Sequence, residues 1–262
     1  MTLLTSGPLL ADKVVLIAGG TQGVGAGIAR AALREGATVV VTGRRPEVAD
    51  RLLRELAGQP ITFLQSDIAD PAQAKDCVAQ TIALHGRIDC LVNAAGDTSR
   101  GNMLNTTPEL FDRHVAVNLR GPFFTMQAAI ANMLDRKATG TIVNIITMSA
   151  HGGQDFLAPY VASKAGLIGL TKNAAHAHRW DRIRINGVNI GWTETEGEDA
   201  TQRTFHGADD TWLEKANASV PMGKLGQVDE IADFVVFLLS ERSGVVTGSV
   251  LDWDQIVMGG LD

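Results

Sequence analysis

The sequence predicts an α/β protein built on a single doubly wound parallel sheet with helices on both faces. Short runs of consecutive apolar residues alternate strictly with longer segments of helical spacing along the 262 residues. Such alternation produces parallel strands joined by right-handed crossovers. The apolar share of 45% and the charged share of 20% are close to globular averages, which excludes a disordered chain. No repeat or Pro/Gly-rich linker divides the sequence, so we expect one domain over residues 1–262 with a short ragged arm at Met1–Leu10.

Each expected element has a local reason. Val14–Ala18 is apolar at every position, as a strand buried on both faces should be, and Gly23–Glu35 has helical spacing that ends before Gly36. Pro46 and Pro71 begin further helices. The other expected strands are Thr38–Thr42, Ile61–Gln65, Ile88–Asn93, Thr141–Ile146, Ile183–Ile190 and Ser249–Asp252. The other expected helices are Pro46–Ala57, Pro71–Leu84, Pro108–Arg136, Pro159–His178 and Val228–Leu239, and Trp192–Val220 is polar and irregular.

Charge and cysteine content narrow the class of partner and compartment. The chain has 23 Lys and Arg against 29 Asp and Glu, a net charge of -6, which is poorly suited to a nucleic-acid backbone. Cys77 and Cys90 form neither a CxxC pair nor a disulfide framework, as expected in a reducing cytosol. The apolar run Phe234–Leu239 is far too short to span a bilayer, and the N-terminus lacks a secretory pattern. We therefore expect a cytoplasmic protein without nucleic-acid or membrane partners.

A glycine-rich loop follows the first expected strand. Residues 18–25 read AGGTQGVG, which gives the spacing G-x-x-x-G-x-G at Gly19, Gly23 and Gly25. Glycines let backbone amides approach a pyrophosphate, and the N-terminus of the next helix favours negative charge. A tight turn without a ligand is the alternative. The strand before the loop and the helix after it favour a dinucleotide.

The end of the second strand indicates which nicotinamide cofactor is preferred. An NAD site usually has a carboxylate here for the ribose hydroxyls. This strand ends in Gly43-Arg44-Arg45, and the first acid is Glu47. Arginine holds a 2′-phosphate through charge-assisted hydrogen bonds. We therefore favour NADP, with Arg44 as first candidate and Arg45 as second; NAD, with both arginines merely solvated, is the alternative.

The only tyrosine, Tyr160, precedes Lys164 by one helical turn. Positions four apart share a helix face. An ammonium about 4 Å from a phenol can lower its pKa by roughly three units, which suits acid–base catalysis. The spacing is also common in helices without a function.

With Gly19-x-x-x-Gly23-x-Gly25, Asn93-Ala94-Ala95-Gly96, Asn118 and Tyr160-x-x-x-Lys164 in this order, the chain resembles the classical short-chain dehydrogenase/reductases. The resemblance runs from about Asp12 to Asp254. It implies a Rossmann-type fold and an NAD(P)-dependent oxidoreductase that transfers a hydride between the nicotinamide and an alcohol or ketone. It also implies that the segment of about residues 192–220 (Trp192–Val220) is a substrate lid.

The resemblance assigns catalytic roles. Tyr160 would exchange a proton with the substrate oxygen, Lys164 would lower its pKa and bind the nicotinamide ribose, and Asn118 would hold a water. Thr147 stands where the family has Ser; it keeps a hydroxyl, and Ser149 is an alternative. Ile190-Gly191 replaces the usual Pro-Gly, and Ala18 replaces a frequent Thr. The cofactor-binding candidates are Gly19, Thr21, Gln22, Gly23, Val24, Gly25, Arg44, Arg45, Asp67, Asn93, Ala94, Gly96, Tyr160, Lys164, Gly191, Thr193 and Thr195.

Two polar loops indicate the substrate class. Residues 151–155 read HGGQD and residues 192–199 read WTETEGED, whereas an apolar pocket would need apolar walls. We expect a small polar alcohol such as a sugar or polyol, because acids, amides and a Trp ring suit hydroxyl-rich ligands and acids disfavour anions. The substrate-binding candidates are Ser149, His151, Gln154, Asp155 and Trp192. Alternatives are a reductase of apolar cyclic or aryl ketones, an epimerase or dehydratase, and a non-catalytic nucleotide-binding module.

The remaining histidines and helices carry less information. His176 and His178 are two apart on a helix and do not share a face, so we expect no metal site. His114 lies one turn before Asn118, and we expect it to be structural. The helices around Phe111–Met133 and Leu167–Ala177 have more apolar surface than one sheet face needs. In this family such helices pair across a two-fold axis, which implies a homotetramer; the alternative is that both are simply core.

Overall fold

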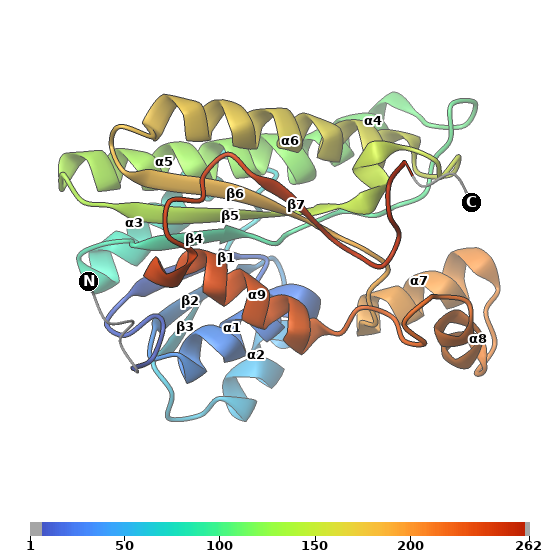
Figure 1. Ribbon diagram of the computed structural model, residues 1–262, viewed down its shortest axis with the longest axis horizontal. Coiled ribbons are helices and arrows are strands. Elements are labelled where there is room, and N and C mark those ends of the chain that lie inside the picture. Colours follow the sequence, from blue (N-terminus) through green and yellow to red (C-terminus); the bar gives the residue numbers. More distant parts are fainter. Residues whose placement is uncertain (1–6, 260–262) are drawn as a thin grey trace.

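The computed structural model describes residues 7–259 as one sheet between two helical layers, with a small helical lobe beyond one end of the sheet (Figure 1). The strands are β1 Val14–Ala18, β2 Thr38–Gly43, β3 Ile61–Gln65, β4 Cys90–Asn93, β5 Gly140–Thr147, β6 Ile183–Ile190 and β7 Val250–Trp253. The helices are α1 Gly23–Arg34, α2 Pro46–Glu55, α3 Pro71–His85, α4 Pro108–Val115, α5 Gly121–Asp135, α6 Ala158–His178, α7 Glu196–His206, α8 Trp212–Ala218 and α9 Val228–Leu239. Short helical turns are η1 Ala116–Arg120, η2 Met148–His151 and η3 Glu241–Ser243. The predicted doubly wound fold is confirmed.

The strand order is β3-β2-β1-β4-β5-β6-β7, and each neighbouring pair is parallel. The chain leaves β1 toward β2 on one side and returns at β4 on the other, so the order reverses between β1 and β4. Ala18 lies opposite Asn93, and Asn93 lies opposite Asn144, which aligns the carboxyl ends of the three central strands. In open α/β sheets the crevice outside this reversal is where ligands bind.

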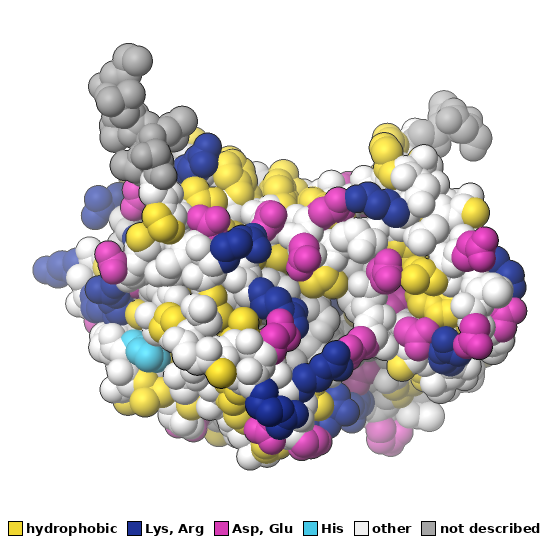
Figure 2. Space-filling view, turned by 90° about the horizontal axis from the view of Figure 1, so that it is seen from below, with side chains coloured by type: hydrophobic (Ala, Val, Ile, Leu, Met, Phe, Trp, Pro, Cys, Tyr) yellow, Lys and Arg dark blue, Asp and Glu magenta, His cyan; other side chains and the backbone are white. Residues whose placement is uncertain are grey.

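Two apolar layers bury the sheet. One face is covered by α1, α2 and α9, with Ile28 and Val235 fully buried, and the other by α3, α5 and α6, with Val78 and Met133 fully buried (Figure 1). Strand residues are therefore apolar on both faces, as the sequence predicts. Seen from the side of α1 and α2, basic and acidic side chains are interspersed, with hydrophobic ones scattered between them (Figure 2). No helix in residues 7–259 is long and apolar enough to cross a membrane.

The long helical region expected from about Pro108 to Arg136 is present, but it is divided into three helical segments. The π-helical turn η1 separates α4 from α5, and Pro122 follows directly. Proline has no amide hydrogen, so the α-helical donor to the Asn118 carbonyl is missing. Elsewhere the expected ends differ from the structure by a few residues, as at β4, which begins at Cys90 rather than Ile88.

Two other expectations need correction. Of the arm Met1–Leu10, residues 1–6 lie outside the described residues, but Leu10 is fully buried and its amide donates to the Glu35 carbonyl at 2.9 Å. The end of the arm is therefore part of the core. The segment Trp192–Val220 is not irregular, because it contains α7 and α8. Its apolar residues are few, and a buried cluster around Trp212 and Leu225 is what holds the lobe together.

Candidate active site

The glycine loop is shaped by close approaches of the backbone. Gly19 has φ 81°, and a Cβ there would lie 2.5 Å from Ala95 Cα, so the loops after β1 and β4 touch. A Cβ on Gly25 would overlap the Gly19 carbonyl oxygen, which requires glycine where α1 meets the loop. A Cβ on Gly23, φ 54°, would instead point into free space, with Thr195 the nearest side chain at 3.9 Å.

The first turn of α1 fits a dinucleotide. Its N-cap Gln22 makes no side-chain cap, and no acidic side chain stands in the turn. The free amides and the helix dipole therefore face the open side of the loop, where they favour an anion. This arrangement fits the pyrophosphate of a nicotinamide dinucleotide.

The two arginines after β2 differ in placement. Arg45 donates from Nη2 to Gln22 Oε1 at 3.1 Å, so its guanidinium lies beside the glycine loop. Arg44 is exposed, and only its carbonyl is bonded, by Gln65 Nε2 at 3.1 Å. The neighbouring Gly43 has little room, because a Cβ would lie 2.8 Å from Thr21 Oγ1. The structure thus brings Arg45 to the loop, whereas we expect Arg44 first from sequence.

Asn93 is not free to bind a cofactor through its side chain. Its Nδ2 donates to Asn144 Oδ1 at 2.8 Å, and its Oδ1 accepts from Thr125 Oγ1 at 2.7 Å. The residue is buried and ties β4 to β5 and α5. Its side chain is therefore structural, so a contact of Asn93 with a cofactor would have to come from its backbone. Asp67, after β3, is half-buried, and its Oδ1 accepts from the Ala69 amide at 3.0 Å.

Thr147, Tyr160 and Lys164 meet at the carboxyl end of β5. Thr147 is the last residue of the strand, and α6 presents Tyr160 and Lys164 one turn apart. Lys164 is buried, donates from Nζ to the Ile145 carbonyl at 2.8 Å and lies 6.0 Å from the centroid of the Tyr160 ring. A Cβ on Gly96 would be 4.0 Å from the same Nζ, so the loop after β4 adjoins the pair.

Burial dominates the acidity of this pair. It raises the pKa of Tyr160 to about 12, although the Thr147 hydroxyl and the Arg100 guanidinium act to lower it. It also lowers the pKa of Lys164 to about 8. The groups that shift the Tyr160 pKa in this arrangement are Thr147, Arg100 and Glu198 besides burial, while the Lys164 ammonium donates to a backbone carbonyl. With this pKa, Tyr160 keeps its proton at neutral pH.

Asn118 lies in η1 and uses its whole side chain inside the protein. Oδ1 accepts from the Asp97 amide at 2.8 Å, and Nδ2 lies within 3.2 Å of the Asp97 carbonyl, Ser163 Oγ and His114 Nδ1. A water in the proton relay can thus bond only to its carbonyl, which lacks the α-helical donor. His114 is buried, bonds to the Ser99 carbonyl at 3.0 Å and lies edge-on to Tyr160, and burial lowers its pKa.

The residues after β6 lie across the crevice from the glycine loop. A Cβ on Gly191 would overlap the Asp254 carboxylate, so close approach requires glycine here. The Thr193 hydroxyl donates to the Gly191 carbonyl at 2.9 Å. Thr195 caps α7 by accepting from the Glu198 amide at 2.9 Å, and its methyl group faces Gly23.

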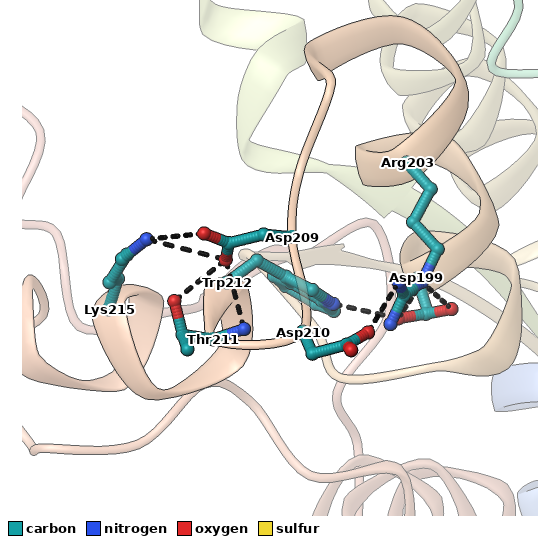
Figure 3. Close-up of polar contacts among 7 residues, drawn as sticks. All are labelled: Asp199, Arg203, Asp209, Asp210, Thr211, Trp212 and Lys215. Carbon is teal, nitrogen blue, oxygen red and sulfur yellow. Dashed lines mark hydrogen bonds and ion pairs between the residues drawn. The ribbon is translucent and has the colours of Figure 1, made fainter.

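Most acidic side chains of the lid are hydrogen-bonded to other residues of the protein and do not point free into the crevice. Figure 3 shows Arg203 bonded to both Asp199 and Asp210, and Asp209 bonded to Thr211 and Lys215. Asp199 also accepts from Trp212 Nε1 at 2.7 Å. Three further acids also have partners: Glu194 bonds with Gln227, Glu196 with Arg51, and Glu198 with Trp192 and Gln202.

The expected substrate residues are only partly available. Trp192 stacks on Trp212 with centroids 6.4 Å apart, so one ring face is covered. His151 Nε2 lies 3.2 Å from Asp252 Oδ1, and Ser149 Oγ donates to Gln154 Oε1 at 2.9 Å. Ser149 therefore bonds within its own loop, while the Thr147 hydroxyl accepts from the Ser149 amide at 3.1 Å and acts to lower the Tyr160 pKa. Asp155 is exposed.

Arg100 is the residue of this site that sequence analysis missed. It follows β4, the Arg100 and Tyr160 charges influence each other's pKa, and two aromatic rings flank the guanidinium. Its position in a loop after a central strand is the only sequence signal that could have found it. Within residues 7–259, no group of three or more His, Cys, Asp and Glu side chains is arranged to hold a metal ion.

Comparisons with known proteins agree with this geometry. A family model described as Enoyl-(Acyl carrier protein) reductase matches residues 18–255. The chain is 34% identical to the 3-oxoacyl-[acyl-carrier-protein] reductase FabG of Thermotoga maritima, covering 94% of this chain and 97% of that protein. It is 31% identical to a 3alpha-hydroxysteroid dehydrogenase of Mediterraneibacter gnavus, covering 94% and 97%.

Solved structures give the same result. A protein of Sinorhizobium meliloti 1021 assigned as a short-chain alcohol dehydrogenase superposes with TM-score 0.85 at 30% identity, covering 94% of this chain and 96% of that one. A variant of ElxO with NADPH bound superposes with TM-score 0.83 at 30% identity, covering 92% and 96%. The chain belongs to the short-chain dehydrogenase/reductase family, whose members are oxidoreductases.

Proposed function

We propose that the protein is an NADP-preferring oxidoreductase that interconverts a small polar alcohol and its ketone. The observation that carries the proposal is the meeting of Thr147, Tyr160 and Lys164 beside the crevice formed by the glycine loop. The bound nicotinamide supplies or accepts the hydride. Tyr160 donates its proton to the carbonyl oxygen in reduction and accepts it in oxidation, and the Thr147 hydroxyl bonds the same oxygen.

The preference for NADP rests on two features. Arg45 lies beside the glycine loop, and no carboxylate follows β2 before Glu47. A relative, the ElxO variant, was solved with NADPH. A panel of ketones assayed with both reduced cofactors tests this, and we expect kcat/KM for NADPH to exceed that for NADH at least about 10-fold. Equal or reversed values would contradict the preference, and no turnover with either cofactor would favour a non-catalytic module.

We propose small polar alcohols and ketones as the substrate class, which is broader than the sugars and polyols expected from the sequence. The expectation of a sugar or polyol rests on lid acids as partners for hydroxyls, but those acids bond within the protein. They therefore give no support to a sugar in particular. Apolar cyclic and aryl ketones belong in the same assay panel, because Phe156 and Phe205 lie near the site. Faster turnover of those ketones than of any polar one would refute the proposed class.

Thr147 and Ser149 can be separated by substitution. Thr147→Val keeps the shape but removes the hydroxyl that stabilises charge on the oxygen, and we expect kcat to fall about 100-fold. Thr147→Ser and the control Ser149→Ala should each remain within a few-fold of the parent protein. If Thr147→Val is fully active, Thr147 has no catalytic role.

We also propose a cytoplasmic homotetramer. Phe111 on α4 and Phe123 and Leu134 on α5 are 44%, 43% and 39% exposed, which supports pairing of these helices between copies. Both cysteines are free and buried, as suits a reducing compartment. Light scattering on the purified protein measures its mass, and a monomer would contradict the assembly.

A further inference from the structure

Arg100 is held rigidly beside the segment that leads to the catalytic tyrosine. The next residue, Gly101, forms a parallel bridge with Leu157. The Gly101 amide donates to the Phe156 carbonyl at 2.9 Å, and the Ala158 amide donates to the Gly101 carbonyl at 2.9 Å. Because Tyr160 follows Ala158 by two residues, these bonds fix Arg100 and Tyr160 relative to each other.

Aromatic side chains flank the guanidinium on the sheet side and on the lid side. Its central carbon lies 5.2 Å from the Phe156 ring centroid and 5.8 Å from that of Phe205 in α7. Nη2 lies 3.3 Å from Nε2 of His206, at the end of the same helix. An arginine nitrogen can only donate, so this imidazole nitrogen accepts. Such walls partly bury the guanidinium and strengthen any ion pair that forms there.

The guanidinium has unused hydrogen-bond donors. Nη1 donates to the Thr98 carbonyl at 2.9 Å, and Nε is buried without a partner. Within the described part of the chain, no carboxylate lies within 4.0 Å of Arg100. Glu198 is the acid whose charge it senses most, but Glu198 Oε1 already accepts from Trp192 and Gln202. A permanent cation with a buried free donor is unusual beside a site that serves only neutral ligands.

We propose that Arg100 binds a carboxylate of the substrate, so that the enzyme acts on hydroxy acids and the corresponding oxo acids. The planar fork of arginine matches a carboxylate through two parallel hydrogen bonds. One cation with Glu198 nearby suits a singly charged group better than a doubly charged phosphate ester. The inference rests on the proposed function and deepens it by naming the charged group of the substrate.

Two further observations agree with this assignment. The Arg100 charge lowers the pKa of Tyr160, and the tyrosine charge raises that of Arg100, so both groups act on the same region. The acids of the lid, which from sequence alone argue against an anionic substrate, are paired with lid and neighbouring residues. Arg51, Arg203 and Lys215 therefore compensate part of the lid's negative charge.

The test compares acids with neutral partners of the same skeleton. Short 2-oxo and 3-oxo acids and their primary amides are reduced with NADPH by the parent protein, Arg100→Gln and Arg100→Lys. We expect the parent protein to prefer the best acid over its amide about 100-fold in kcat/KM. In Arg100→Gln, kcat/KM for the acid should fall until this preference is lost, whereas kcat/KM for the amide should stay within about 3-fold of the parent value. Arg100→Lys keeps the charge without the fork and should lose about 10-fold on the acid.

Controls separate this role from a structural one. Arg203→Gln removes a lid arginine that pairs with Asp199 and Asp210, and it should leave the acid-to-amide ratio unchanged. Equal losses on acid and amide in Arg100→Gln would show that Arg100 only holds the fold, and a parent protein without acid preference would also overturn the inference. If Arg100→Gln fails to fold, as judged by circular dichroism, Arg100→Lys gives the answer.

A binding measurement distinguishes this inference from the proposed function. Calorimetric titration of the NADP-bound protein with butyrate and with butyramide needs no turnover. Arg100-dependent binding of butyrate without any reductase activity would uphold the carboxylate site and refute the proposed function. Reduction of neutral ketones without Arg100-dependent butyrate binding would uphold the function and refute the carboxylate site.

Discussion

At the carboxyl edge of the sheet, Gly19 and Gly25 leave less room than a single methyl group, and Asn93 and Lys164 are buried with their polar atoms bonded. In the lid, by contrast, Asp210 pairs with Arg203 and Lys215 pairs with Asp209 while these side chains are exposed to solvent. The edge depends on close packing of backbone, whereas the lid combines a small apolar cluster with many polar contacts between side chains. Both regions border the same crevice.

This difference indicates which region carries out the reaction and which controls the entry of the substrate. Groups packed into a sheet edge stay within a fraction of an ångström of their positions, as acid–base and hydride chemistry requires. Exposed ion pairs stabilise little each, and a lobe with one small apolar cluster and several such pairs belongs to the low-stability end of the molecule. We therefore expect substitutions at the edge to change the reaction and substitutions in the lid to change substrate entry.

The largest expected effect is at Tyr160. Tyr160→Phe removes the proton donor, and no other tyrosine exists to replace it. We expect kcat to fall about 1000-fold, with the Kd for NADP within a few-fold, because the ring and its packing remain. Steady-state kinetics and fluorescence titration measure both. More than a few percent of residual activity would show that another group moves the proton.

The cofactor preference should respond to the crowding at the end of β2. Gly43→Asp with Arg45→Ala introduces a carboxylate for ribose hydroxyls and removes the arginine beside the glycine loop, which should shift the preference toward NAD about 100-fold. The new side chain meets Thr21, so the shift needs Thr21→Ala as well. Kinetics with both cofactors on the double and triple variants measure it. A parent protein that already prefers NAD would show that the arginines are surface charge.

The buried Lys164 ammonium should lower the free energy of unfolding of the protein. Burial lowers its pKa from 10.5 to about 8, so the unfolded chain holds the proton more tightly and stability from this group rises as pH increases from 8 to 10.5. We expect Lys164→Met to be inactive but more stable at pH 7 by roughly 1–3 kcal/mol, with the gain shrinking at pH 10. Urea unfolding at both pH values measures this. The exposed Lys172→Met is the control, and equal effects of the two would exclude the burial cost.

The smallest expected effect is in the lid. Hydrogen bonds from Thr211 and Lys215 lower the pKa of Asp209 to about 2 from the ordinary value of 3.8. The bonds of the Asp209 carboxylate are therefore intact above pH 3.8 and are lost as the pH falls through 2.

Hydrogen exchange at neutral pH should be faster in α7 and α8 than in β5. It should be faster still in Arg203→Gln, with the melting temperature nearly unchanged. If the backbone amides of the lid exchange as slowly as those of β5, the lid is not less stable than the sheet edge, which would contradict the proposed difference between the two regions.

Much of the edge is readable from local patterns. The glycines at 19, 23 and 25, the apolar strands and the Tyr160–Lys164 spacing each depend on residues within one turn or one strand of each other. Backbone conformation and helix periodicity act over this range, so the fold class is predictable from them. The choice of Tyr160, Lys164 and Thr147 as candidate catalytic residues needed the family resemblance as well, because the spacing of Tyr160 and Lys164 also occurs in helices without a function.

The role of Arg100 and the pairing of the lid acids depend on partners far along the chain. Phe156 and His206 are 56 and 106 residues from Arg100, and no periodicity connects them. A charged side chain looks the same in sequence whether it faces water, a counterion or a substrate. Its meaning depends on which groups the crossovers bring within hydrogen-bond distance and how much water they exclude, and those quantities exist only in the folded chain.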